Sequence, residues 1–296
     1  MRIFLTGSTG FIGSKIVPEL IQAGHQVLGL TRSDVGAAEL AAAGAQAHRG
    51  DIEDLDSLRS GASVCDGVIH TAFDHNFANF AANCRKDSRA IAAMGAALEG
   101  SDRPLVITSS TAMGTAGPGR FATEDDFNPE SPNPRVASEL AGRELSQRGV
   151  NVSVVRLSQI HDTRRQGLVT DMVRLAIEKG CAAYVGEGLN QWSAAHVCDA
   201  ARLFRLAFEK HEPEARYHAT AEPGIAFRHI AQAIGQRLGL PVVAIAPEEA
   251  AGHFGWLAAF ADKDMMATSA MTQKRLGWKP TGPGLIADLE QMQAAF

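Results

Sequence analysis

The sequence predicts an α/β fold: a doubly wound parallel sheet with a smaller C-terminal α/β cap. Short apolar runs alternate with longer segments of helical spacing through the first half of the 296-residue chain. Several of these runs are apolar throughout, as expected for parallel strands that helices cover on both faces. Right-handed crossovers then wind the helices onto both sides of the sheet. After Leu157 this regular alternation ends, which predicts a second unit.

In the first half, short apolar runs of strand length are separated by segments of helical length. Strands are predicted at 3–6, 25–31, 45–48, 67–71, 104–108 and 150–157. Helices are predicted at 11–23, 35–43, 53–60, about 76–99, and 134–147. Asn133 is the expected N-cap of the last of these helices, with Pro134 in its first position. These elements make residues 1–158 the predicted dinucleotide-binding domain.

The remaining residues predict a cap made of excursions from the main sheet. The expected elements are a helix at 166–179, a strand at 182–185, a turn at 186–190, a helix at 197–210 and a strand at 216–220. A mostly helical tail follows from residue 227, interrupted by a strand at 242–245. We assign 159–195 and 224–296 to a substrate-binding cap, and we expect 196–223 to return to the first domain.

Composition excludes several classes of protein. The chain is 45% hydrophobic and 21% charged with a net charge of −5, which argues against disorder and against nucleic-acid binding. It contains no apolar run of the ~20 residues that a membrane helix needs, and its N-terminus lacks a secretory pattern. Four scattered cysteines without CxxC spacing favour a reducing cytoplasm over a disulfide scaffold or zinc site. We expect a small-molecule substrate and no nucleic-acid or membrane partner; a homodimer is compatible with the sequence, which leaves the oligomeric state open.

A glycine-rich turn directly follows the first predicted strand and opens the first helix. Thr6-Gly7-Ser8-Thr9-Gly10-Phe11-Ile12-Gly13 has the spacing GxxGxxG. Glycines at these positions allow a tight turn and a close approach of the backbone to a pyrophosphate, and the helix N-terminus offers free N–H groups. This context predicts a Rossmann-type dinucleotide site at Gly7, Thr9, Gly10, Phe11 and Ile12. The alternative is a merely tight strand-to-helix turn.

Several further stretches lie in the order of one known family. They are TGSTGFIG, GDIED, VIHTAF, LVITSST, VVRLSQIH, YVGEGLNQWSAAHVCDAARL and LGWKPTGPGLIADL. With them the chain resembles an extended short-chain dehydrogenase/reductase of the NAD-dependent epimerase/dehydratase group. The resemblance covers nearly the whole chain; it implies the fold and an NAD(P) cofactor, and it says much less about the substrate.

The end of the second strand bears on the choice of nucleotide. An NAD site of this fold carries Asp or Glu there, whereas this chain reads Leu30-Thr31-Arg32-Ser33. Arg32 can bind a 2′-phosphate with help from the Thr31 or Ser33 hydroxyl, which favours NADP over NAD; the alternative is a solvated arginine. Asp34 is better explained as a helix N-cap.

The resemblance implies further cofactor contacts. It places Asp51 and Ile52 at the adenine, although Asp51 is equally suited to cap the next helix. Six more positions on the turns after the later strands are expected to line the rest of the cofactor: Thr71, Ala72, Phe73, Thr108, Ser158 and Ile160.

The catalytic positions depart from the family pattern. The family uses a Ser or Thr, then a Tyr and a Lys four residues later, and Ser110 matches the first of these. Arg135 stands at the Tyr position and Glu139 at the Lys position, and the chain contains no YxxxK. Arginine cannot donate a proton near neutral pH. Arg135 and Glu139 either pair with each other at i,i+4, or bind a substrate carbonyl and the ribose hydroxyls respectively.

The loop after the strand at 150–157 carries another candidate for proton transfer. His161 has a pKa suited to acid–base work, and the alternative is a loop histidine bonded to backbone. Arg164 and Arg165 are either solvated or attract an anionic substrate. Trp192 and His196 either line the pocket or pack where the cap rejoins the first domain, and packing is the favoured interpretation. His70, Asp74 and His75 are close in sequence but need not converge, so no metal site is predicted.

Three functions follow from these observations. The first is an NADP-dependent oxidoreductase of a small carbonyl or hydroxyl compound, whose catalytic site uses Ser110, Arg135, Glu139 and His161 with a non-standard proton donor. The second is a catalytically degenerate sensor of NADP(H). The third, a nucleotide-sugar epimerase or dehydratase, ranks lower because it needs the missing tyrosine.

Overall fold

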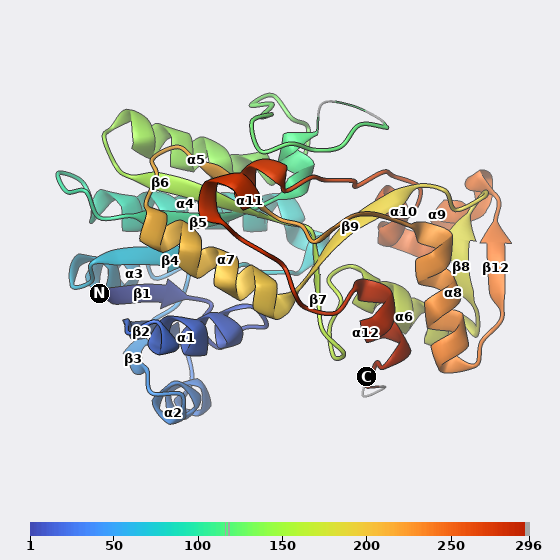
Figure 1. Cartoon of the computed structure of the whole chain (residues 1–296), viewed down its shortest axis with the longest axis horizontal. Helices are drawn as coiled ribbons and strands as arrows, with labels where there is room; N and C mark the ends of the chain where they lie inside the picture. The colour runs from blue at the N-terminus through green and yellow to red at the C-terminus, as the bar shows by residue number, and fades with distance from the viewer. Residues whose placement is uncertain (116, 118, 294–296) are drawn as a thin grey trace.

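A seven-stranded parallel sheet forms the larger half of the molecule in the computed structural model, which describes residues 1–293 apart from 116 and 118 (Figure 1). Its strands, in spatial order, are β10 (Arg216–Ala219), β6 (Val152–Leu157), β5 (Leu105–Ser110), β4 (Gly67–His70), β1 (Arg2–Thr6), β2 (Gln26–Thr31) and β3 (Gln46–Arg49). The strand order reverses between β1 and β4. In doubly wound sheets, ligands bind at the carboxyl ends of the strands beside such a reversal.

Helices cover both faces of this sheet. One face carries α1 (Gly13–Gln22), α2 (Asp34–Ala42) and α7 (Val197–Lys210). The other carries α3 (Leu55–Ser63), α4 (Phe80–Ala96) and α5 (Val136–Gln147). The apolar run of β1 supplies both faces, since Ile3 and Leu5 pack with the first set and Phe4 with the second. This two-sided burial is the reason that β1 is apolar at successive positions.

The cap consists of two small sheets and the helices packed on them. The strands are β7 (Gln159–His161), β9 (Gln191–His196) and β11 (Glu222–Ala226) in one sheet, and β8 (Ala182–Val185) and β12 (Val242–Ile245) in the other. The helices are α6 (Val169–Lys179), α8 (Phe227–Leu238), α9 (Ala250–Phe254), α10 (Ala258–Ala261) and α12 (Leu285–Glu290). The described residues also form four short 3₁₀ turns: η1 (Phe77–Asn79), η2 (Thr111–Gly114), η3 (Pro247–Glu249) and η4 (Gly255–Leu257).

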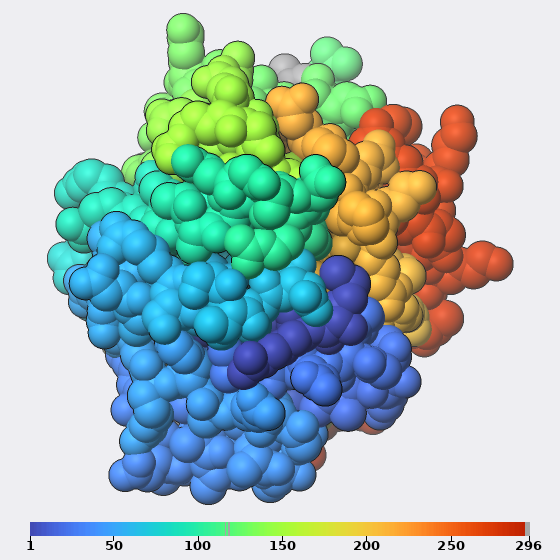
Figure 2. Space-filling view, turned by 90° about the vertical axis from the view of Figure 1, so that its left-hand side faces the viewer, coloured from blue at the N-terminus to red at the C-terminus, as the bar shows by residue number. Residues whose placement is uncertain are grey.

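One segment assigned to the cap belongs elsewhere. Helix α11 (Ala270–Leu276) packs against β10 and α7, and Trp278 is fully buried in the core of the large sheet. Figure 2 agrees, because C-terminal residues in red lie along the edge of the domain beside the golden α7. The prediction that all of 224–296 forms the cap is therefore wrong for this segment. The segment carries both polar and apolar residues, and only the tertiary packing decides which half it joins.

The N-caps of three helices, α2, α3 and α5, are not the residues that the sequence predicted. The hydroxyl oxygen of Ser33, not the carboxylate of Asp34, accepts the N–H of Gly36 at the start of α2. Asp54, not Asp51, caps α3. Asn133 is not the N-cap of α5: that position is Arg135, without a side-chain capping bond, and the Asn133 side chain accepts the Arg135 N–H at 3.0 Å in the turn before the helix. Within the described residues, no helix has the length and apolar character needed to cross a bilayer.

Candidate dinucleotide site and catalytic positions

The glycine-rich turn joins β1 to α1 at the carboxyl edge of the sheet. Gly7 has φ +67°, and a Cβ built on it would lie 2.7 Å from the backbone nitrogen of Ala72. A Cβ on Gly13 would overlap the carbonyl oxygen of Gly7. Both positions therefore require glycine, Gly7 for its left-handed backbone and Gly13 for the close approach of the helix.

The first turn of α1 is suited to an anion. Ile12 at the N-cap has no side-chain capping bond, and the first turn contains no acidic residue. Thr9 and Gly10 are exposed and Phe11 is partly exposed. The Ser14 and Lys15 N–H groups already donate to backbone carbonyls. Those of Phe11, Ile12 and Gly13 have no partner among the described residues and can bind the pyrophosphate of a dinucleotide, so the residues present fit that group.

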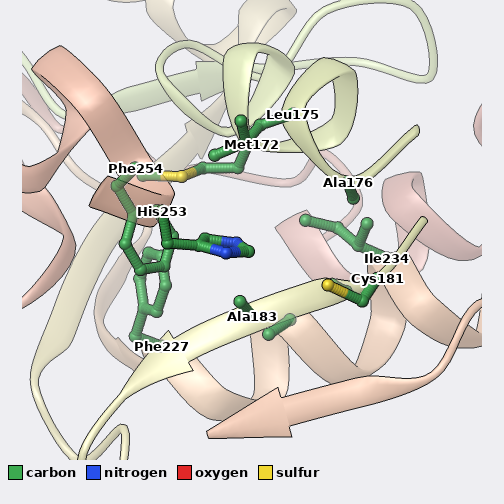
Figure 3. A pocket seen from close by; sticks show the side chains of 11 residues that line it. Met172, Leu175, Ala176, Cys181, Ala183, Phe227, Ile234, His253 and Phe254 are labelled. Atoms are coloured by element: carbon green, nitrogen blue, oxygen red, sulfur yellow. The ribbon is translucent and has the colours of Figure 1, made fainter. Parts of the chain in front are cut away.

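A cleft opens between this turn and the cap. Its volume is about 270 Å³, and it is lined by Thr9, Gly10, Phe11, Ser14, Lys15, Asp162, Arg164 and Arg165. A second cavity lies wholly within the cap, where the His253 imidazole points among apolar side chains such as Met172 and Phe227 (Figure 3). Its volume is only about 10 Å³, room for about one water molecule. The larger, polar cleft is the candidate site.

The end of β2 places Arg32 at the surface. Its side chain is 81% exposed, and Nη1 lies 3.5 Å from the carboxylate of Asp51 on the neighbouring loop. Thr31 is buried, whereas Ser33 is exposed with its oxygen capping α2. The guanidinium therefore remains reachable, and Asp51 and the partly buried Ile52 lie on the loop beside it.

The other cofactor positions are mostly engaged with the backbone. The Thr71 hydroxyl donates to the Thr6 carbonyl, and the Ala72 N–H donates to the Thr6 hydroxyl. The Thr108 hydroxyl donates to the His70 carbonyl, and the Ser158 hydroxyl to that of Ala219. These bonds fix the turns that border the site. Ile160 is buried on β7 and contributes packing.

A buried polar network links the glycine-rich turn to the start of α5. The Thr6 hydroxyl lies 2.6 Å from His70 Nδ1, and His70 Nε2 lies 3.0 Å from one oxygen of Asp87. The other Asp87 oxygen accepts from the Ser138 hydroxyl at 2.5 Å and from Arg135 at 2.7 Å. Although burial raises it, the pKa of Asp87 is lowered to about 2 by Arg135 and His70.

Arg135 does not pair with Glu139, which corrects the predicted i,i+4 ion pair. Its guanidinium also donates to the Thr108 carbonyl at 2.8 Å and lies 4.2 Å from the centroid of the Phe73 ring. The residue is only 8% exposed. Arg135 is a fixed cation beneath an aromatic ring at the carboxyl edge of the sheet.

Glu139 is enclosed one turn further along α5. Its carboxylate accepts two bonds from Arg156, at 2.8 and 2.9 Å, and one from Arg216 at 3.0 Å. These arginines hold the pKa of Glu139 below its ordinary value despite the opposing effect of burial. Its side chain has no exposed surface. The expectation that Glu139 binds ribose hydroxyls is therefore wrong.

His161 does not line the cleft, and neither do Ser110 and Arg135. Its ring is fully buried in the cap, and Nδ1 lies 2.7 Å from the carboxylate of Asp288 on α12. Nε2 has no hydrogen-bond partner among the described residues and faces Glu222 at 4.0 Å. Burial lowers the pKa of this histidine although Asp288 opposes the shift. A ring without exposed surface cannot deliver a proton to a substrate, so we withdraw His161 from the catalytic set.

The remaining candidates divide between packing and surface. Trp192 is fully buried and donates to the Lys263 carbonyl, and His196 caps α7 by accepting the Cys198 N–H. Ser110 is partly exposed, and its oxygen accepts the N–H of Ala112. Among the described residues, no group of three His, Cys, Asp or Glu side chains is arranged to hold a metal ion.

Sequence reasoning missed the residues that tie the site together. Thr6, Asp87 and Arg156 were not predicted, and His70 was considered only as a metal ligand. A buried polar residue within an apolar strand run, such as Thr6 in β1 or Arg156 in β6, is the signal that could have identified them.

This combination defines a dinucleotide-binding α/β protein. The model of the NAD-dependent epimerase/dehydratase family matches residues 3–219, so the chain belongs to that family. The uncharacterized protein C2A9.02 of Schizosaccharomyces pombe is 46% identical over 98% of each chain. The 2-alkyl-3-oxoalkanoate reductase of Stenotrophomonas maltophilia is 28% identical, covering 73% of this chain and 67% of its own. The dTDP-glucose 4,6-dehydratase DesIV of Streptomyces venezuelae, with NAD bound, shares the fold with a TM-score of 0.77, 20% identity and 98% and 96% coverage.

Proposed function

We propose that this protein is an NADP(H)-dependent oxidoreductase that acts on a small carbonyl or hydroxyl compound without a tyrosine proton donor. The observation that carries the proposal is the cleft beside the glycine-rich turn, which joins an uncapped helix N-terminus to a wall from the cap. A similar protein from Stenotrophomonas is named as a reductase.

The preference for NADP rests on Arg32. Its guanidinium is 81% exposed at the end of β2, where an NAD site of this fold carries a carboxylate. A 2′-phosphate can replace Asp51 as its partner and form two parallel charge-assisted bonds. Such bonds contribute roughly 1.5–3 kcal/mol each, enough for at least tenfold discrimination.

The chemistry assigned to the chain follows from Ser110 and Arg135. A bound nicotinamide supplies or accepts the hydride. Because the Ser110 oxygen accepts a backbone N–H, its hydroxyl proton remains free to be donated to a substrate oxygen. Arg135 lies at the same sheet edge, but Asp87 compensates its charge, so it orders the border of the site rather than stabilising charge on a substrate. Arginine keeps its proton near neutral pH, so water delivers the proton to the reduced product.

A second candidate is a protein that binds NADP(H) without turning it over. It is favoured by the internal pairing of both replaced positions, Arg135 with Asp87 and Glu139 with Arg156. In this case the cofactor would stabilise the closed cleft and a partner would respond to that state.

Two measurements on the purified protein test these proposals. Fluorescence titration should show NADPH binding, and incubation with a panel of aldehydes and ketones should show NADPH oxidation by at least one of them. Binding without oxidation across the panel would favour the sensor, and absence of binding would refute both. We further propose a reducing cytoplasm as its location, consistent with four free cysteines.

A further inference from the structure

The wall of the cleft that faces the glycine-rich turn is a short loop of the cap. It carries Asp162, Arg164 and Arg165, while Ser14 and Lys15 stand on the opposite wall at the start of α1. Lys15 and both arginines are exposed. Three cations therefore surround a cleft that contains a single lining carboxylate.

The Asp162 carboxylate binds backbone N–H groups of its own loop rather than the arginine side chains. One oxygen of Asp162 accepts the backbone N–H of Arg164 at 2.7 Å and that of Arg165 at 2.9 Å. The Asp162 N–H donates to the Arg165 carbonyl, and the Gln166 amide donates to the Asp162 carbonyl. The loop is thus a fixed turn that presents two consecutive arginines.

The Arg164 and Arg165 guanidinium groups form no ion pair with a carboxylate in the part of the chain that the structure describes. The Arg164 side chain donates one hydrogen bond, to the Gln293 amide oxygen at 3.3 Å. Arg165 also lies near His75: desolvation lowers the pKa of that histidine, and the positive charges of Arg135 and then Arg165 lower it further. Arg165 therefore lies near the loop that joins β4 to α4.

We propose that Arg164 and Arg165 form a cap-side phosphate site that binds the pyrophosphate of the dinucleotide opposite the N-terminus of α1. The proposal rests on the proposed function, since it concerns the same cleft. It is argued from the fixed arginine turn, which lies across the cleft from the start of α1, where the N–H groups of residues 11–13 have no partner among the described residues. Planar guanidinium groups suit phosphate oxygens because they donate two parallel bonds. A phosphate or carboxylate of the substrate is the other source of the same chemistry.

The test compares the double variant Arg164→Ala/Arg165→Ala with the wild type in titrations with NADPH and NADH. Both cofactors contain the pyrophosphate, so both dissociation constants should rise by a similar factor, about tenfold for each arginine removed. Inorganic pyrophosphate should displace NADH from the wild type, and the variant should need a far higher concentration. Raising the salt concentration should weaken binding less in the variant than in the wild type.

Two matched variants control this experiment. Arg174→Ala removes an exposed arginine of α6, which pairs with Asp171, and should leave both constants unchanged. Arg164→Lys/Arg165→Lys keeps the charge without the planar donor pair and should restore part of the affinity.

The outcomes separate this proposal from the proposed function. If the wild type binds both cofactors and the double variant binds them equally well, the phosphate site is refuted while the proposed function stands. If only the dissociation constant of NADPH rises, the arginines bind the 2′-phosphate rather than the pyrophosphate, and the proposal is overturned. Unchanged cofactor binding with a raised KM for an anionic substrate would assign them to the substrate and likewise overturn it. A wild type that binds neither cofactor refutes the proposed function and the phosphate site together.

Discussion

Two helix starts at the carboxyl edge of the sheet differ in whether their polar groups are already bound inside the protein. At the α1 wall the first-turn N–H groups have no side-chain cap, and Lys15 is exposed beside them. At the start of α5, by contrast, Arg135 and Glu139 are buried, and both are bound to partners inside the protein. The start of α1 therefore keeps donors for a ligand, whereas the charged side chains at the start of α5 are already paired inside the protein.

This difference arises because the charges at the start of α5 are buried and compensated inside the protein. A buried charge needs a partner, because leaving it unpaired costs several kcal/mol. The buried charges of Arg135 and Glu139 are compatible with folding because Asp87, Arg156 and Arg216 supply those partners. We therefore expect substitutions of the buried charges of α5 to change mainly the stability of the protein. Substitutions at the start of α1 or at the end of β2 should change mainly the binding of the ligand.

The largest expected effect is on stability at Glu139. Replacing it with alanine leaves the fully buried Arg156 without its carboxylate, and we expect a loss of about 3–5 kcal/mol in the free energy of unfolding. Urea denaturation measures it. Glu144→Ala on the exposed side of the same helix is the control, with a change within about 0.5 kcal/mol. A loss below about 1 kcal/mol for Glu139→Ala would contradict the structural role of this pair.

The second prediction concerns acid stability through His218. Burial, followed by the nearby Arg156, lowers the pKa of this histidine to about 4, below its ordinary value of 6.5. Nδ1 contacts the Thr268 carbonyl and Nε2 faces Arg156, which fits the neutral ring. Its contribution is thus complete above pH 6.5 and is lost as the pH falls toward 4, a total of about 3 kcal/mol.

Unfolding measured across this pH range checks the prediction. His218→Gln should reduce the pH dependence, whereas His229→Gln at an exposed position should keep the wild-type profile. An unchanged profile in His218→Gln would show that other groups control acid stability.

The third prediction tests the assigned chemistry. Once a substrate is found, Ser110→Ala should reduce turnover by about 10- to 100-fold, because it removes one donor to the substrate oxygen. The affinity for NADPH should stay the same. Tyr184→Phe and Tyr217→Phe should have little effect, and the Tyr217 hydroxyl already contacts Glu212 inside the protein. An inactive tyrosine variant would mean that the proton donor has been misassigned.

The smallest expected effect is on cofactor choice. Arg32→Ala should lower the ratio of NADPH to NADH affinity at least tenfold, about 1.4 kcal/mol, by removing the 2′-phosphate contact. Arg49→Ala, an exposed arginine of the neighbouring strand that pairs with Asp34, is the matched control. Equal affinities of the wild type for both cofactors would remove the basis for the NADP assignment.

Local sequence was sufficient for the parts of this protein that depend on neighbouring residues. The apolar run of β1 predicted a strand covered on both faces, and GxxGxxG predicted the turn, because steric limits act within a few residues. Helix α6 and strands β8 and β12 were predicted close to their observed bounds for the same reason. Strand β7 was missed, since three residues are too few for a periodic signal.

Tertiary structure alone decided which charges are paired. Arg135 meets Asp87, 48 residues away, and His161 meets Asp288, 127 residues away. Spacing along one helix suggested that Arg135 and Glu139 pair, but the fold offered each a buried partner on a different element. Sequence determined where the dinucleotide site begins and that the usual Tyr and Lys are absent. Which polar groups remain free for a ligand depends on long-range packing, because burial and its compensating partners exist only after the chain has folded.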